Sequence, residues 1–115
     1  EFSANDLLER GETDLCVLIG AETVPYFSPL AQSHLRSIPT IVLDYPGSPP
    51  AFTPTIAFTT AVYGLHAVGT VYRMDNVPVQ LRSSMTTELP TDADVLCRIL
   101  AEHDSFKDQM ITPLA

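Results

Sequence analysis

The sequence contains 115 residues, of which 45% are hydrophobic and 17% are charged. This length allows one small core, and the apolar fraction excludes a disordered chain. The formal net charge is -8, from 14 acidic and 6 basic residues, whereas nucleic-acid binding requires a positive surface. We therefore expect one globular domain over residues 1–115 without a nucleic-acid partner. Because the sequence begins at Glu1 rather than Met, we also expect a fragment of a longer polypeptide.

The first part of the chain predicts a strand, a helix and a second strand. Ser3 is a typical N-cap of a short helix that Gly11 would end. Residues 15–19 are five consecutive apolar residues, which is typical of a parallel strand buried on both faces. A helix over residues 28–38 follows, and residues 40–44 form the next apolar run. This order predicts a parallel βαβ unit.

The remaining elements complete an α/β fold. They are a rigid Pro-rich loop over 45–54, a strand over 56–62, an irregular turn over 64–69, a hairpin over 70–73 and 77–81, a helix from 91 to about 103, and a separate turn after 104. We predict a Rossmann-like open sheet, with the order β-α-β-β plus a hairpin, in three layers.

Ligands of such sheets bind at the carboxyl ends of the strands, which directs attention to residues 20–23 and 44–47. The first of these turns has one glycine, Gly20, and lacks the three spaced glycines of a dinucleotide site. Asp44 follows the second strand, where an acid often accepts hydrogen bonds from ribose hydroxyls. It is equally typical of an Asp that initiates a turn before Pro46, and both interpretations stay open.

The sequence indicates no catalytic or metal-binding residue. His34, His66 and His103 have no histidine partner at metal-ligand spacing, and no GxSxG motif is present. Cys16 and Cys97 belong to no CxxC motif, so we expect a reduced pair with Cys16 inert in a strand and Cys97 partly covered.

The distribution of apolar and charged residues bears on where the protein is located and on which part of its surface contacts other protein. No apolar run approaches the roughly 18 residues of a membrane span, and no export signal is visible, so we expect a cytoplasmic protein. Residues 1–22 carry net charge -5 and residues 88–115 carry -4, whereas the middle carries +1. A near-neutral middle is typical of a surface that contacts other protein, or of a buried sheet between solvated helices.

Residues 69–78, GTVYRMDNVP, resemble the GTxYRMDxVP stretch in the B-type subunit of formylmethanofuran dehydrogenase. They also fit a pattern near the end of molybdopterin oxidoreductase domains. The resemblance continues over residues 2–8, 14–20, 34–44 and 89–92, and it covers the last quarter or so of the family's subunit.

The resemblance implies a role in one-carbon metabolism. Archaeal members hold a tungsten or molybdenum bis-pterin cofactor and reduce carbon dioxide to formate. Their metal-binding Cys or selenocysteine precedes the part that resembles this chain. A bacterial branch belongs to a formyltransferase/hydrolase complex, which transfers the formyl group to a methanofuran-type carrier and releases formate. Residues 59–62 and 64–69 depart from the archaeal pattern and favour the bacterial branch.

We therefore expect a C-terminal scaffold domain that is inactive alone, has no cofactor of its own and binds the other subunits of the complex. The resemblance assigns a partner or structural motif to Gly69, Thr70, Tyr72, Arg73 and Asp75. One alternative is half of a pterin-nucleotide pocket in a molybdenum or tungsten oxidoreductase, with contacts at Gly20, Glu22 and Asp44. A free-standing small-ligand binding module is the other alternative.

Overall fold

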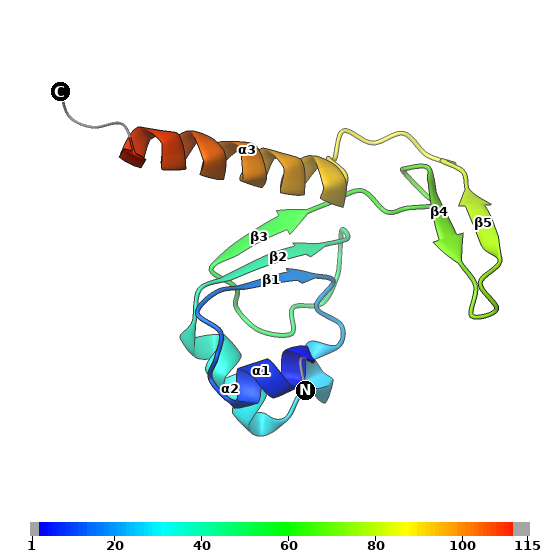
Figure 1. The fold of residues 1–115 in the computed structure, drawn as a ribbon. Coiled ribbons are helices and arrows are strands. Elements are labelled where there is room, and N and C mark those ends of the chain that lie inside the picture. Colours follow the sequence, from blue (N-terminus) through cyan, green and yellow to red (C-terminus); the bar gives the residue numbers. More distant parts are fainter. Residues whose placement is uncertain (1–2, 112–115) are drawn as a thin grey trace. The chain divides into compact units, whose positions relative to one another are not determined.

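The computed structural model describes residues 3–111, and the chain divides into two compact units, Glu1–Thr60 and Ala61–Ala115. The first unit contains α1 (Ala4–Glu9), β1 (Cys16–Ile19), a short 3-10 helix (Val24–Tyr26), α2 (Pro29–Ser37), β2 (Thr40–Asp44) and β3 (Ile56–Thr59) (Figure 1). The second contains β4 (Gly69–Tyr72), β5 (Pro78–Leu81) and α3 (Asp92–Ile111). The α/β class is as predicted, and the single domain over residues 1–115 stays a prediction.

The sheet of the first unit has the order β1-β2-β3, and both pairs of strands are parallel. Cys16 pairs with Thr40, and Ile41 pairs with Ile56. The predicted parallel strand–helix–strand unit is therefore confirmed, with α2 as its crossover helix.

Capping residues define the two helices of this unit. The hydroxyl of Ser3 accepts a hydrogen bond from the Asp6 N–H, and the hydroxyl of Ser28 accepts one from the Ala31 N–H, each at 3.2 Å. Both bonds satisfy an N–H of the first turn that has no partner within its helix. The Asn5 side chain also accepts from the Ser28 N–H at 2.9 Å, which joins the starts of α1 and α2.

The core of the first unit lies on one face of the sheet, where α1 and α2 both pack (Figure 1). Its buried residues are Leu8, Ala21, Val24, Ala31, Leu35 and Val42. Thr40 and Thr55 fix the start of β3 beside β2. The Thr40 N–H donates to the Thr55 hydroxyl oxygen at 3.0 Å, and the Thr55 N–H donates to the Thr40 hydroxyl oxygen at 3.1 Å.

The opposite face of the sheet differs from the prediction. Burial along β1 alternates, and the side chains of Val17 and Ile19 are exposed whereas Leu18 contacts the core. The prediction that residues 15–19 are buried on both faces is wrong for the described chain, because both helices of this unit pack on one side. Within residues 3–60 the sheet therefore has one helical layer, and the predicted three-layer arrangement is not present there.

The second unit contains the predicted hairpin. Val71 pairs with Val79 and Tyr72 with Pro78 in an antiparallel register. Asn76 has φ of 62° in the turn, a conformation that asparagine tolerates better than most residues.

Two predicted boundaries are wrong. The strand predicted over 56–62 ends at Thr59, and the Ala61 N–H donates to the Pro90 carbonyl at 2.8 Å instead of extending the sheet. The last helix continues to Ile111 rather than ending near His103, because residues 104–111 contain neither Gly nor Pro to interrupt it. None of the described helices has the combination of length and apolar composition that a membrane span needs.

Candidate functional site

A hollow of about 200 Å³ lies at the carboxyl ends of β2 and β3, within the first unit. Its floor is formed by these strands and its rim by the Pro-rich loop that joins them. The lining residues include Asp44, Tyr45, Gly47, Ser48, Phe52 and Thr59. Parallel α/β sheets bind ligands at this end of their strands, so this hollow is the candidate site.

Among the described residues that line the hollow, Asp44 is the only acidic one. Both of its carboxylate oxygens accept hydrogen bonds from backbone N–H groups. Oδ2 accepts from the Ala21 N–H at 3.2 Å, and Oδ1 accepts from the Tyr45 N–H at 2.9 Å. The first bond joins the end of β2 to the turn after β1, and the second closes the start of the loop. Asp44 therefore joins the end of β2 both to the turn after β1 and to the first residue of the Pro-rich loop.

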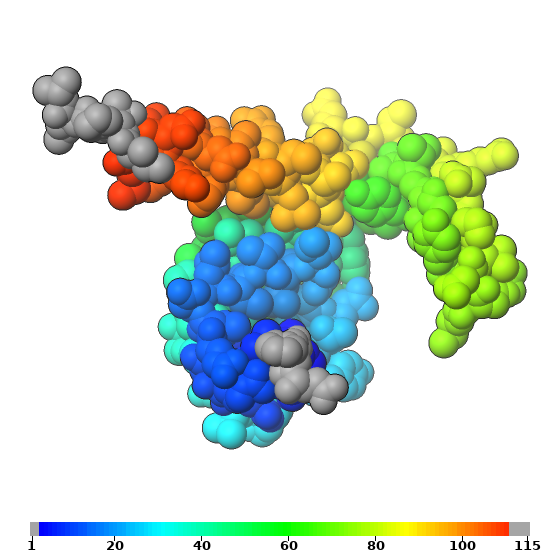
Figure 2. Space-filling model, viewed as in Figure 1, coloured from blue at the N-terminus to red at the C-terminus, as the bar shows by residue number. Residues whose placement is uncertain are grey.

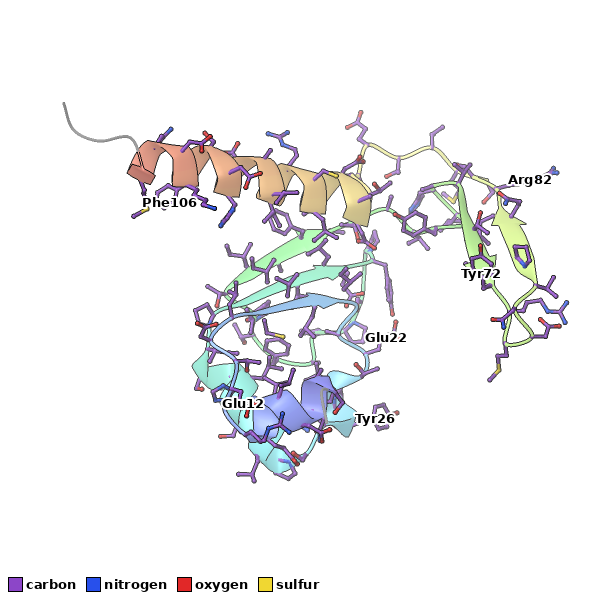
Figure 3. All side chains as sticks on the ribbon, viewed as in Figure 1. Glu12, Glu22, Tyr26, Tyr72, Arg82 and Phe106 are labelled. Atoms are coloured by element: carbon purple, nitrogen blue, oxygen red, sulfur yellow. The ribbon has the colours of Figure 1, made fainter. Side chains whose placement is uncertain are left out.

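Gly20 and Glu22 lie beside this arrangement without lining the hollow. Gly20 has φ of 76°, its N–H donates to the Leu43 carbonyl at 2.8 Å, and a Cβ placed on it would meet nothing within 4 Å. Glu22 is exposed (Figure 3). The structure thus brings Gly20 and Asp44 to the same end of the sheet and leaves Glu22 outside the hollow.

Sequence reasoning missed the residues that the Pro-rich loop and β3 bring to the hollow. Ser48, Phe52, Phe58 and Thr59 all line it. The signal was the loop itself, because a segment that joins two parallel strands runs from the carboxyl end of one strand back to the start of the next and so crosses the sheet. The sequence did not say which side chains such an irregular loop would turn inward.

The GTVYRMDNVP motif forms most of the hairpin of the second unit. The Gln80 side-chain amide donates to the Thr70 hydroxyl at 3.0 Å, which joins the two strands on one face. Arg73 and Asp75 form an ion pair at 3.0 Å across the turn, with both side chains more than half exposed. The Tyr72 side chain is 70% exposed (Figure 3). The motif therefore combines a closed turn with an aromatic side chain that the second unit does not bury.

Gly69 begins the motif for a steric reason. A Cβ at this position would lie 3.2 Å from Cδ1 of Tyr63, closer than most such contacts. Tyr63 belongs to a compact turn in which the Val62 N–H donates to Nδ1 of His66 at 3.1 Å. The glycine thus allows β4 to start against the Tyr63 ring.

The remaining candidate residues have structural partners. His34 Nε2 lies 2.7 Å from the Thr13 carbonyl, and His103 pairs with Asp104. Across residues 3–111, no three His, Cys, Asp or Glu side chains gather as a metal site would require.

The two cysteines lie in different surroundings. Cys16 packs against the core, and burial raises the pKa of its thiol. Cys97 lies on α3 and is exposed, which is compatible with the prediction that it is only partly covered.

Comparison with known proteins identifies two similar chains, while no family model matches. The B-type subunit of tungsten-containing formylmethanofuran dehydrogenase 2 from Methanococcus maripaludis is 30% identical over 109 residues, which is 93% of this chain and 25% of the relative. The protein of the same name from Methanocaldococcus jannaschii is 40% identical over 82 residues, which is 71% of this chain and 19% of the relative. The chain thus spans a quarter or less of these relatives.

Proposed function

We propose that this chain, which the comparisons relate to the B-type subunits of formylmethanofuran dehydrogenase, is a scaffold segment of such a subunit. In this proposal it carries no catalytic residue and holds its subunit in a multisubunit complex of one-carbon metabolism. The departures from the archaeal pattern at residues 59–62 and 64–69 support a formyltransferase/hydrolase complex as its setting. The proposal also places that complex in the cytoplasm.

The observation that carries the proposal is that both carboxylate oxygens of Asp44 accept hydrogen bonds from the backbone. This acid lines the candidate hollow, and its two oxygens accept from the backbone of Ala21 and Tyr45. A carboxylate that accepts two N–H groups satisfies the local backbone, and this structural need explains the residue without a ligand.

The second candidate function is part of a pterin-nucleotide pocket, favoured by the position of the hollow at the carboxyl end of the sheet. Small-molecule sites generally enclose about 300–1,000 Å³. A hollow of about 200 Å³ fits only a portion of a bis-pterin cofactor. Asp44, Tyr45 and Ser48 would then hold part of the nucleotide, while the bound cofactor would supply redox chemistry. The described residues offer no ligand set for its metal.

Formyl transfer by the complete complex tests the choice between these functions. We expect a complex that contains Asp44→Ala to assemble and to retain near-normal activity per assembled complex. Asp44→Asn, which keeps one side-chain oxygen acceptor, serves as the matched control. A large loss of activity in an Asp44→Ala complex with normal subunit composition would favour the pocket instead.

A further inference from the structure

β1 is an edge strand in the structure, although its sequence is typical of an interior strand. It has β2 as its neighbour on one side, and the described residues place no strand on the other. The Cys16 N–H donates to the Pro39 carbonyl at 3.1 Å, and the Gly20 N–H donates to the Leu43 carbonyl at 2.8 Å. Because backbone groups along a parallel strand alternate between its two sides, those of Val17 and Ile19 face the open edge.

The side chains of the same residues are apolar and exposed. Leu15, Val17 and Ile19 are 52%, 43% and 57% exposed, and they share one side of the strand. Figure 2 shows this blue segment at the surface of the first unit. Three alternate apolar side chains beside an open edge form a continuous surface, which we call the β1 surface.

Natural edge strands carry devices that prevent further pairing, such as a Lys, a Pro, a bulge or an inward-pointing charge. The sequence of β1, CVLI, contains none of these. Parallel sheets also occur almost only with both faces covered by helices. β1 has four residues, and shortness is itself one such device, but its apolar side chains beside open backbone groups still favour pairing with a further strand.

We infer that β1 is an interior strand of a wider sheet, and that a further strand of the same polypeptide pairs with the Val17 and Ile19 edge. The length of the relatives supports a strand of the same polypeptide as the occupant. The relative from Methanococcus maripaludis is about four times as long as the part of it that this chain matches. A helix of the same polypeptide covers the β1 surface in this arrangement. The inference rests on the chain being part of a longer B-type subunit, and it holds whether that longer protein is a scaffold or holds a cofactor.

Amide hydrogen exchange in the full-length subunit tests the inference. We expect the amides of Val17 and Ile19 to exchange on the order of 100-fold more slowly than open amides, and about as slowly as that of Leu18, which faces β2. Fast exchange at Val17 and Ile19 beside a protected Leu18 would overturn the inference. Slow exchange that becomes fast when the subunit is diluted to a monomer would assign the edge to a second copy, and would overturn it as well.

A matched pair of substitutions tests the covering layer. Leu15→Lys should lower the thermal midpoint of the full-length protein by several degrees, because it places a charge beneath a helix. Leu30→Lys, on the outer side of α2 and 69% exposed, should leave it nearly unchanged. Equal midpoints for the two variants would count against the inference. If Leu15→Lys does not fold, Leu15→Ala against Leu30→Ala gives the same comparison through a lost apolar contact.

Discussion

Oδ2 of Asp44 accepts a hydrogen bond from the backbone N–H of Ala21 at 3.2 Å, across 23 residues of sequence. The bond connects the end of β2 with the segment after β1, where Gly20 has a positive φ of 76°. One carboxylate thus fixes the relative position of two neighbouring strand ends.

This relationship predicts that Asp44→Ala destabilises the protein. The substitution leaves the part-buried N–H of Ala21 without its acceptor, which costs about 1–3 kcal/mol of unfolding free energy, whereas water can replace the acceptor of the exposed Tyr45 N–H. Asp44→Asn should cost less, because its amide oxygen still accepts one of the two bonds. Urea unfolding measures both values. Glu22→Ala, which removes an exposed acid near the same end of the sheet, is the control and should change stability by no more than about 0.5 kcal/mol.

The start of the hairpin gives a second prediction, which concerns Gly69 and Tyr63. Gly69→Ala should lower the unfolding free energy by about 1 kcal/mol, because the new methyl group forces the half-exposed Tyr63 ring to move. The double variant Gly69→Ala/Tyr63→Ala should lose less than the sum of the two single variants. Additive losses in this double-mutant cycle would show that the steric explanation of Gly69 is incorrect.

A third prediction separates stability from assembly at the turn of the hairpin. The exposed Arg73–Asp75 ion pair contributes at most about 1 kcal/mol, so Arg73→Ala should leave the protein folded. We expect the same variant, and Tyr72→Ala, to reduce co-purification of the partner subunits. Arg36→Ala removes an exposed arginine from α2 and provides the control for lost charge. Equal recovery of partners with Arg73→Ala, Tyr72→Ala and wild type would exclude this motif as an assembly site.

The start of α3 predicts a dependence on pH. Thr91 N–H donates to Oδ2 of Asp94 at 3.0 Å, while Asp94 N–H donates to the Thr91 hydroxyl at 3.1 Å. The Thr91 N–H, together with the Thr91 hydroxyl, lowers the pKa of Asp94 from its ordinary value of 3.8. A lowered pKa means that this cap stabilises the helix above the unfolded-state pKa and loses its effect as pH falls through the folded-state pKa.

An NMR titration of the Asp94 carboxyl carbon measures this effect. Its midpoint should fall below 3.8, with loosening of the first turn of α3 in the same acidic range. Asp94→Asn should abolish that acid-dependent loosening. A midpoint at or above 3.8 in the wild-type protein would contradict the capping interaction.

Local signals in the sequence predicted much of the first unit. Ser3 and Ser28 are both N-caps, and the two apolar runs around α2 form parallel strands. These features depend on neighbouring residues, so short segments of sequence contain the information. The motif at 69–78 likewise predicted a hairpin, because a polar turn separates two β-prone runs.

The features that sequence did not predict depend on long-range packing. The five apolar residues 15–19 cannot specify whether a helix covers each face of β1, because that depends on other parts of the chain. Which side chains line the hollow depends on how the Pro-rich loop crosses the sheet, and periodicity does not describe irregular backbone. The role of Asp44 was left open between ligand binding and turn formation. The structure shows that the Asp44 carboxylate accepts from the Ala21 N–H, which lies 23 residues away in the sequence.

Elemental and pterin analysis of the purified full-length subunit tests the central claim most directly. The scaffold account predicts tungsten and molybdenum far below one atom per subunit, no extractable pterin, and a complex that still transfers formyl groups. Stoichiometric tungsten or molybdenum together with pterin would contradict it.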